Sequence, residues 1–263
     1  MTLVLPTLGL ADLRRAVRLV APPLIAGAAL IGGWQALSKS GAVSARLLPS
    51  PDKVFDILFR SLDVLLEQAL PTFWGAVLGI VAAAALGIAL GIAVSFSRTL
   101  MRAVYPTVVF FQLIPKVAMA PLFLIWFGTG FTANVVFSVF IAFFPVLVAT
   151  IAGLQATPPN YDRLCQSLMM SRLRGFFSVR LPFALPYIFS GLRIGVTFAV
   201  IGVVLGEFIT AQSGLGYIIL FSANNFETAL LLAAIVLLCG VGALLFAIFL
   251  ALEALVLRIY DSR

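Results

Sequence analysis

Long stretches without a charged residue divide this sequence, and they constrain its fold more than any other feature. Two of them run from Leu70 to Ser97 and from Ile194 to Gly206. A helix of about 20 apolar residues spans the hydrocarbon core of a bilayer, so such stretches predict membrane-spanning helices. Only 10% of the residues are charged and 62% are hydrophobic, against roughly 25% charged residues in soluble domains. A water-soluble fold is therefore excluded.

The distribution of apolar residues predicts an all-α polytopic membrane protein with six spanning helices. The expected spans cover residues 18–37, 70–97, 103–126, 132–155, 184–209 and 228–257. No internal repeat, low-complexity stretch or linker separates these spans, and the loops between them are too short for a second folded domain. We therefore expect one transmembrane domain that includes residues 1–263.

Basic residues are distributed unevenly between the two sides of the expected domain. Six spans place both termini on one side, and the positive-inside rule assigns the more basic side to the cytosol. The cytosolic side then carries Arg14, Arg15, Arg18, Arg98, Arg102, Arg163, Arg172, Arg174, Arg180, Arg258 and Arg263. The other side carries only Lys39, Arg46, Lys53 and Arg60. This asymmetry explains the net charge of +7 without a nucleic-acid partner.

Two segments have patterns of their own. From Asp52 to Glu67, apolar residues at helical spacing lie opposite charged ones, which predicts a helix in the outer membrane interface. In the second expected span, small residues recur at four-residue steps, namely Gly75, Gly79, Ala83, Gly87 and Gly91. Such a stripe lets another helix approach closely, so we interpret it as a packing surface.

The longest expected cytosolic connection covers about residues 157–180. Pro158, Pro159 and Asn160 mark the start of a helix there. One face of this helix would be apolar and flanked by arginines, with Leu164, Leu168, Met169 and Leu173. An exposed apolar face favours docking to another protein, and a helix lying on lipid headgroups is the alternative.

A series of short motifs resembles the binding-protein-dependent ABC permeases. In the cytosolic connection and the span that follows, these motifs are Ser167-Leu168, Ser171-Arg172, Leu181-Pro182, Leu185-Pro186 and Gly191-Leu192-Arg193-Ile194. Elsewhere they are Leu47 to Pro51, Pro115 to Leu122, Trp126-Phe127-Gly128, Gly206-Glu207 and Ser213 to Tyr217. Together they are similar to the branch that imports sulfonates, taurine, nitrate, pyrimidine precursors of thiamine and riboflavin. Within this branch, the stretch from Asn225 to Thr228 is more similar to the permeases that import heterocycles.

The resemblance implies a type I ABC importer permease in a bacterial inner membrane, which moves a small polar solute into the cytosol. In that family the cytosolic connection forms a coupling helix that sits in a groove of the ATPase. By similarity, the coupling residues here are Arg163, Leu164, Cys165, Ser167, Leu168, Met169, Met170, Ser171, Arg172 and Leu173. The implied partners are ATP-binding cassette ATPase subunits, an extracytoplasmic solute-binding protein and a second permease copy in a homodimer. ATP and Mg²⁺ would bind to the ATPase, and this chain would bind no cofactor.

Some coupling residues depart from the family pattern. Arg163 stands where Glu is usual, Leu164 and Cys165 replace an Ala pair, and Met169 replaces a characteristic Gly. Met and Leu are better helix residues than Gly, so we still expect a helix from Arg163 to Leu173. The larger and more positive helix predicts a dedicated ATPase with a matching groove.

The third expected span contains the candidate translocation path. Pro115 and Pro121 remove helix hydrogen bonds near its middle, which a membrane tolerates only where protein or a water-filled cavity satisfies the freed carbonyls. Lys116 lies near mid-membrane, where an ionisable side chain is costly and usually functional. We assign Phe111, Gln112, Pro115, Lys116 and Pro121 to the path. Lys116 either contacts an anionic or electron-rich solute or bonds the freed carbonyls.

Glu207 is expected near the outer end of the fifth span. A glycine-containing segment follows it that is too short and irregular to cross the bilayer. Glu207, Gly214 and Gly216 are therefore candidates for an outer gate. Alternatively, Glu207 only ties this loop by hydrogen bonds.

Other functional classes fit the sequence less well. It has no histidine and no apparent metal cluster or activated nucleophile, so we predict neither a catalytic residue nor a metal site. A GxxxxGK[ST] phosphate loop is also missing, which assigns ATP hydrolysis to another polypeptide. The alternative function is an ion-gradient-driven secondary transporter, but the internal repeats and mid-membrane carboxylates typical of that class are not evident.

Overall fold

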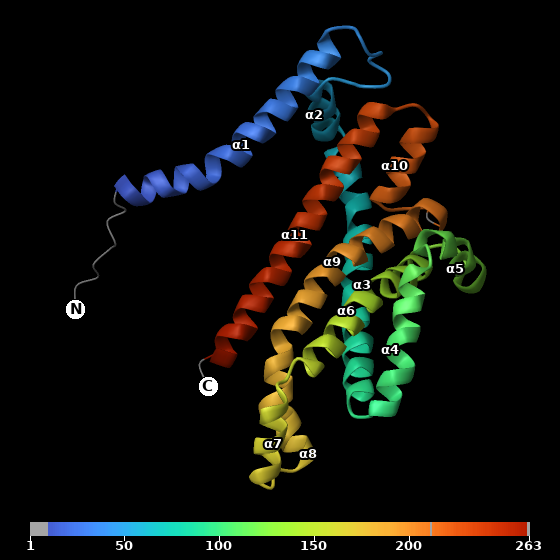
Figure 1. Ribbon diagram of the computed structural model, residues 1–263. Coiled ribbons are helices and arrows are strands. Elements are labelled where there is room, and N and C mark those ends of the chain that lie inside the picture. Colours follow the sequence, from blue (N-terminus) through green and yellow to red (C-terminus); the bar gives the residue numbers. More distant parts are fainter. Residues whose placement is uncertain (1–9, 211, 262–263) are drawn as a thin grey trace.

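The described part of the chain is built from helices. The computed structural model describes residues 10–210 and 212–261, and these residues contain no strand. The α-helices are α1 (Leu10–Lys39), α2 (Pro51–Arg60), α3 (Leu62–Ser95), α4 (Arg98–Leu113), α5 (Ala120–Phe127), α6 (Phe131–Gln155), α7 (Pro159–Ser167), α8 (Arg172–Gly175), α9 (Leu181–Thr210), α10 (Leu215–Asn224) and α11 (Thr228–Asp261). A 3₁₀ turn, η1 (Lys116–Met119), precedes α5, and a π-helical turn, η2 (Phe176–Arg180), precedes α9. The expected all-α class is confirmed (Figure 1).

Four stretches of the described residues are long and apolar enough to cross a membrane. They are Leu62–Ser95, Phe131–Gln155, Arg172–Ile209 and Thr228–Arg258. A fifth span results if the bent pair Thr99–Leu113 and Lys116–Phe127 is counted as one. The four or five spans found among the described residues are consistent with the expected polytopic membrane fold. The predicted first span falls within α1 and is not among these stretches.

Three helices, α3, α6 and α9, form the centre of the fold, and α6 packs against both α3 and α9. Glycines allow these helices to approach closely. A Cβ added at Gly79 would overlap the Ser138 side chain, and one at Gly202 would lie 2.7 Å from the Ser138 Cα atom. Ser138 also donates a buried hydrogen bond to the Ala199 carbonyl at 2.9 Å. The predicted packing role of the small-residue stripe in α3 is confirmed, because all five of its residues are buried.

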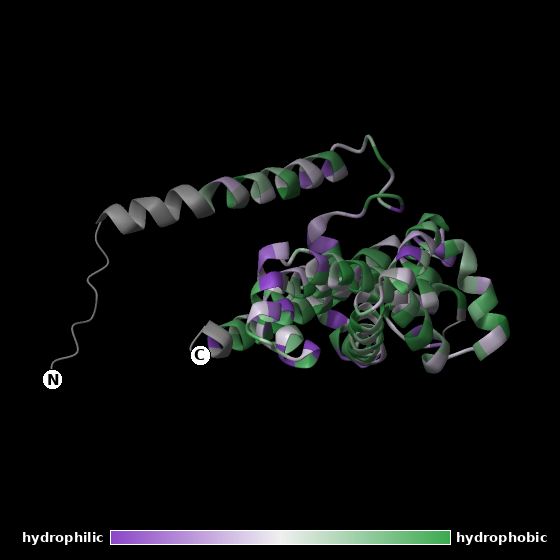
Figure 2. Ribbon diagram, turned by 60° about the horizontal axis from the view of Figure 1, so that its bottom comes forward, coloured by the Kyte–Doolittle hydropathy of each residue, from purple (hydrophilic) through white to green (hydrophobic). Residues whose placement is uncertain are grey.

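The two ends of the bundle differ in what they carry. Figure 1 shows α7 and α8 at one end, and α2 and α10 at the opposite end. Hydrophobic residues predominate along the long helices between these ends (Figure 2). We call the two ends the α7–α8 end and the α2–α10 end. Arg263, which the charge distribution assigns to the cytosolic side, lies outside the described residues.

The predicted interfacial helix over residues 52–67 is wrong in its extent. The helix α2 ends at Arg60, Ser61 leaves helical geometry at φ −103° and ψ 15°, and the rest of the segment is the start of α3. The apolar face packs against protein, since Val54 and Leu65 are both 1% exposed in a cluster that includes Ala233 of α11. Sequence periodicity cannot distinguish an apolar face that meets lipid from one that meets another helix.

The predicted third span is also wrong as a single helix. The helix α4 ends at Leu113, and Ile114 and Pro115 have extended backbone geometry, with ψ of 127° and 99°. The chain then turns by 88° into η1 and α5. Pro115 disfavours helical geometry in the residue before it and provides no backbone donor, so the helix stops there instead of kinking.

Candidate functional site

The predicted coupling helix from Arg163 to Leu173 is interrupted. The helix α7 ends at Ser167, and α8 begins at Arg172. Between them Met169 adopts a left-handed backbone with φ of 50°. Its N–H bonds the Gln166 carbonyl at 3.0 Å, and the Met170 N–H bonds the Cys165 carbonyl at 2.9 Å. This hydrogen-bond pattern is typical of a helix C-terminus, where glycine normally occupies the left-handed position. The helix therefore ends before Met169, although Met has a good helix propensity.

The predicted coupling residues all lie at the α7–α8 end. Arg163, Leu164, Cys165 and Ser167 belong to α7, Arg172 and Leu173 belong to α8, and the turn between the helices contains Leu168, Met169, Met170 and Ser171. Four apolar side chains of this segment are exposed, with exposed fractions of 53%, 64%, 94% and 65% for Leu164, Leu168, Met169 and Leu173. We call these four residues the α7–α8 patch. They pack against no core of the described chain, which leaves an apolar surface suited to a protein partner.

Aromatic contacts fasten this segment to the bundle. Phe176 is 4% exposed, lies in a buried cluster with Leu154 and Ile188, and contacts Phe96 of the α3–α4 turn with a ring-centroid distance of 5.1 Å. Tyr161 of α7 contacts Phe183 of α9 at 4.9 Å. Helical structure is also continuous from α8 through η2 into α9. A displacement of the α7–α8 patch would therefore be transmitted to α9.

The predicted path residues lie around the break between α4 and α5. Lys116 is half-buried, and its Nζ atom lies 5.6 Å from the centroid of the Phe144 ring. Phe111 is 42% exposed, and its ring is nearly parallel to that of Phe144 at a centroid distance of 6.5 Å. Gln112 is half-buried on the last turn of α4. The break therefore combines one cation with two aromatic faces.

Of the two prolines, only Pro115 disrupts the helix. Pro121 lies in the first turn of α5, where the missing N–H has no helical partner to lose. The prediction that Pro121 frees carbonyls in mid-helix is therefore wrong. At the break itself, no group among the described residues donates a hydrogen bond to the carbonyls of Phe111, Gln112 and Leu113. These carbonyls need water or another protein as a partner, because lipid provides none.

Glu207 is the centre of a buried hydrogen-bond network at the other end of α9. It is 1% exposed, and its carboxylate accepts hydrogen bonds from Thr72 Oγ1 and from the Gly216 N–H, both at 2.8 Å. Thr72 Oγ1 in turn accepts from the Leu215 N–H at 2.9 Å. Gly214 has φ of 107°, and a Cβ at this position would overlap the Glu207 carboxylate. The structure thus brings together the three predicted gate residues.

Sequence patterns did not identify two partners in this network. Gln68 Oε1 accepts from the Gly214 N–H at 2.7 Å, and Thr72 bridges α3 to the loop after α9. The available signal was their four-residue spacing at the start of an apolar span, which places two polar side chains on one helix face. An ion pair between Arg193 of α9 and Glu253 of α11, with an N–O distance of 2.9 Å, was likewise not predicted.

Within the described ranges, no group of three or more His, Cys, Asp or Glu side chains is placed to hold a metal ion.

Comparisons with known proteins identify similar chains. The family model for binding-protein-dependent transport system inner membrane components matches residues 75–259. A probable ABC transporter permease protein of Haemophilus influenzae is 36% identical over 230 residues, covering 88% of this chain and 94% of the relative. A formylaminopyrimidine transport permease protein of Halalkalibacterium halodurans is 37% identical over 216 residues, covering 80% of this chain and 85% of the relative. A riboflavin transport system permease protein of Chloroflexus aurantiacus is 32% identical over 227 residues, covering 86% and 85%.

Proposed function

This chain belongs to the family of binding-protein-dependent transport system inner membrane components. From that premise we propose that the chain forms a homodimeric permease and that the permease imports a small planar heterocycle. Members of the family are membrane components of ATP-driven importers, and a separate ATPase hydrolyses ATP. The chain is therefore a transport subunit of the inner membrane rather than an enzyme. Its system includes an ATPase and a solute-binding protein.

The exposed α7–α8 patch is the observation that carries the proposal. Its four apolar side chains are more than half exposed and belong to none of the hydrophobic clusters of the described residues, yet the segment is fixed to α9 by buried and aromatic contacts. Such an exposed apolar surface can bind another subunit, and its attachment to α9 allows a movement of that subunit to reach the membrane-spanning helices. We assign this surface to the ATPase, which places the α7–α8 end in the cytosol. ATP and Mg²⁺ bind to the ATPase in this proposal.

The break between α4 and α5 supports both a path and a second copy. Leu113 and Val117 are 76% and 55% exposed there, so the segment with the unpaired carbonyls reaches the surface of this chain. Lipid cannot cover such backbone in the membrane, whereas a second copy or a water-filled path can. In a homodimer, two such breaks would face a shared pathway.

The solute class follows from the same region and from the relatives. Lys116 provides hydrogen-bond donors only, so it requires an acceptor on the solute. Phe111 and Phe144 lie beside it and offer faces on which a planar ring can stack. The relatives named for formylaminopyrimidine and riboflavin are carriers of planar heterocycles that bear acceptor groups. A small sulfonate-like anion is the second candidate, because it also provides acceptors for Lys116.

The geometry suggests how nucleotide closure reaches the outer side. The stretch Arg172–Ile209 runs as continuous helix from the α7–α8 end to within a few residues of the outer loop. At that far end, Glu207 holds Gly216 and binds Thr72 of α3. ATP-driven closure that moves the α7–α8 patch would tilt α9 and so displace the loop that Glu207 holds. We infer that this opens the path toward the binding protein and that hydrolysis resets it.

Reconstitution with the ATPase and the binding protein tests the proposal. Leu168→Glu and Met169→Glu should abolish assembly or solute-stimulated ATP hydrolysis, because each places a charge in the apolar docking surface. Gln166→Glu is the matched control, since it adds the same charge to an exposed position of α7 outside the patch. Full activity in both patch variants would contradict the coupling assignment. Solute transport by the chain alone without nucleotide would instead indicate an ion-gradient-driven secondary transporter.

A further inference from the structure

A pocket at the α7–α8 end belongs to neither the path nor the α7–α8 patch. It has a volume of about 290 Å³ and lies where α3 ends, α4 begins, α6 ends and η2 leads into α9. Its polar lining includes Ser97, Arg102, Gln155, Thr157 and Arg180, and we call it the α4 pocket. Small-molecule sites usually have volumes of roughly 300–1,000 Å³, so this pocket suits a small chemical group.

Hydrogen-bond donors in the α4 pocket lack acceptors among the described residues. The Thr157 Oγ1 atom is buried and has no hydrogen-bond partner there. Ser97 Oγ accepts from the Leu100 N–H at 3.2 Å, and its own O–H donates to no described group. The Arg102 guanidinium forms no ion pair or hydrogen bond with the described residues. Because a buried hydroxyl without a partner is destabilising, an acceptor from outside the chain would stabilise this site.

The start of α4 adds positive potential to this pocket. The first helical hydrogen bond of α4 runs from the Met101 N–H to the Ser97 carbonyl at 2.9 Å, so the N–H groups before Met101 have no carbonyl within the helix. Such a helix end carries a partial positive charge and favours anions. The first turn of α4 contains no acidic residue, and Arg102 follows it with a further positive charge. An anion bound here would offset both.

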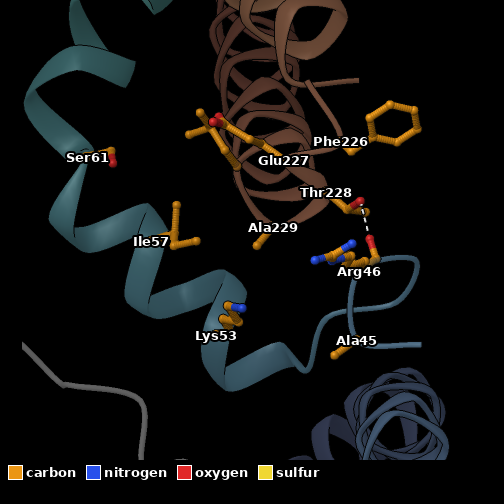
Figure 3. A pocket seen from close by; sticks show the side chains of 10 residues that line it. Ala45, Arg46, Lys53, Ile57, Ser61, Phe226, Glu227, Thr228 and Ala229 are labelled. Carbon is orange, nitrogen blue, oxygen red and sulfur yellow. Dashed lines mark hydrogen bonds between the residues drawn. The ribbon is translucent and has the colours of Figure 1, made fainter. Parts of the chain in front are cut away.

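The described lining of the α4 pocket carries charge of one sign. It provides two arginines, Arg102 and Arg180, and no carboxylate. Arg180 already has a partner, but a guanidinium has five N–H donors and can bind an additional acceptor. The pocket of about 440 Å³ at the α2–α10 end differs, because Glu227 accompanies Arg46 and Lys53 in its lining (Figure 3). An anion is therefore better accommodated in the α4 pocket.

We propose that the α4 pocket binds a phosphate group. Arginine and hydroxyl donors around a helix N-terminus are suited to hold phosphate oxygens. The pocket lies where the long apolar helices end, so an anionic phospholipid headgroup can reach it from the membrane and a soluble phosphate from the water. The positive-inside rule explains arginines at this end, but not their convergence with partnerless hydroxyls on one pocket. This site requires only the membrane location of the chain and is independent of the proposed solute and partners.

A phosphate in the α4 pocket would link the segments that flank it. Arg102 belongs to α4, and Arg180 ends the π-helical turn η2 directly before α9. Turns of this kind are frequent at functional sites. Arg180 and Ser95 also line a second pocket of about 370 Å³, which extends to Cys165 and Arg172 of the α7–α8 segment. A bound phosphate would therefore hold the base of α9 against α4 and stabilise the folded chain.

Thermal unfolding of the purified full chain in detergent tests this site. Short-chain phosphatidylglycerol and inorganic phosphate are titrated separately, and one of them should raise the unfolding midpoint in a saturable way. Arg102→Gln should raise the half-saturating concentration by roughly tenfold, because charge-assisted hydrogen bonds are lost. Thr157→Val, which keeps the side-chain shape, should raise it by roughly threefold without lowering the stability of the free chain. Arg258→Gln is the matched control, because it removes the same charge from an exposed position at the end of α11, outside both pockets.

The two probes distinguish the source of the phosphate. Saturation by phosphatidylglycerol alone, weakened in Arg102→Gln and Thr157→Val but not in Arg258→Gln, supports the site and identifies a lipid headgroup. The same pattern with inorganic phosphate supports the site and identifies a soluble ligand. An equal response of wild type and all three variants shows a general charge or detergent effect and overturns the site, as does the absence of a saturable response to either probe. Neither of these negative results affects the coupling assignment, because Arg102 and Thr157 lie outside the α7–α8 patch.

Discussion

Met169 combines an unusual backbone conformation with a side chain that faces away from the rest of the chain. Its backbone is left-handed, with φ of 50°, and its side chain is 94% exposed. The left-handed conformation costs a non-glycine residue about 1–2 kcal/mol. Because the Met169 side chain is almost fully exposed, its packing within this chain does little to offset that strain. The residue therefore allows local strain and partner binding to be measured separately.

Met169→Gly should raise the stability of the permease and lower its coupling. Relief of left-handed strain by about 1–2 kcal/mol exceeds the roughly 0.5–1 kcal/mol that glycine loses in backbone entropy. The thermal unfolding midpoint in detergent should rise by a few degrees or stay constant, whereas solute-stimulated ATP hydrolysis should fall because the docking side chain is gone. Met170→Gly is the control, because Met170 has ordinary backbone geometry and should only be destabilised. A clear loss of stability in Met169→Gly would contradict the strain argument.

Residue identity predicted part of the buried network around Glu207. The sequence marks Glu207, Gly214 and Gly216, because a carboxylate beside a glycine-containing loop is conspicuous at the end of an apolar span. It does not mark Gln68 and Thr72 as partners, since their contacts with the loop join residues more than 140 positions apart. Such pairings depend on how α3 packs against α9, and local patterns contain no information on that packing. Gating of the path and simple tying of the loop both stay predictions for this network.

At the level of helices, glycines set how closely α6 and α9 can pack. Gly202→Val should destabilise the fold by several kcal/mol, because a Cβ there would lie 2.7 Å from the Ser138 Cα atom and would push the helices apart. Gly242→Val in α11 is the matched control, since a Cβ at Gly242 meets no atom within 4 Å. Yield of folded protein and resistance to unfolding in detergent would measure the difference. Equal loss in both variants would show that helix propensity rather than packing is responsible.

Helix existence was easier to predict than helix continuity. The long apolar stretches 132–155 and 228–257 match α6 and α11 closely, because length and hydropathy alone define such spans. The expected third span failed at Ile114 and Pro115, where the sequence indicated a proline but not whether the helix would kink or end. The coupling segment failed for a related reason at Met169. At Met169 the chain takes the less favoured left-handed conformation, which the helix propensity of Met does not predict.

At the scale of the whole molecule, the unpaired backbone at the α4–α5 break predicts where a second copy lies. The carbonyls of Phe111, Gln112 and Leu113 receive no hydrogen bond from the described residues, and the Leu113 side chain is 76% exposed. A bilayer cannot satisfy such groups, so this surface must face protein or water. In the proposed homodimer, equivalent breaks in the two copies then lie close to each other across the path.

Cysteine cross-linking can test this arrangement in native membranes. In a background with Cys165→Ser and Cys239→Ser, Leu113→Cys should form an intermolecular disulfide under mild oxidation, because a bridge requires the two Cα atoms to come within about 7 Å. Val117→Cys, in η1 on the other side of the break, extends the test if the exact facing position differs. Leu252→Cys on α11 is the control, since it is 56% exposed on a helix whose apolar surface is expected to meet lipid. Cross-linking of the α11 control but not of either break position would place the second copy on α11 and would leave the break to a path within one chain.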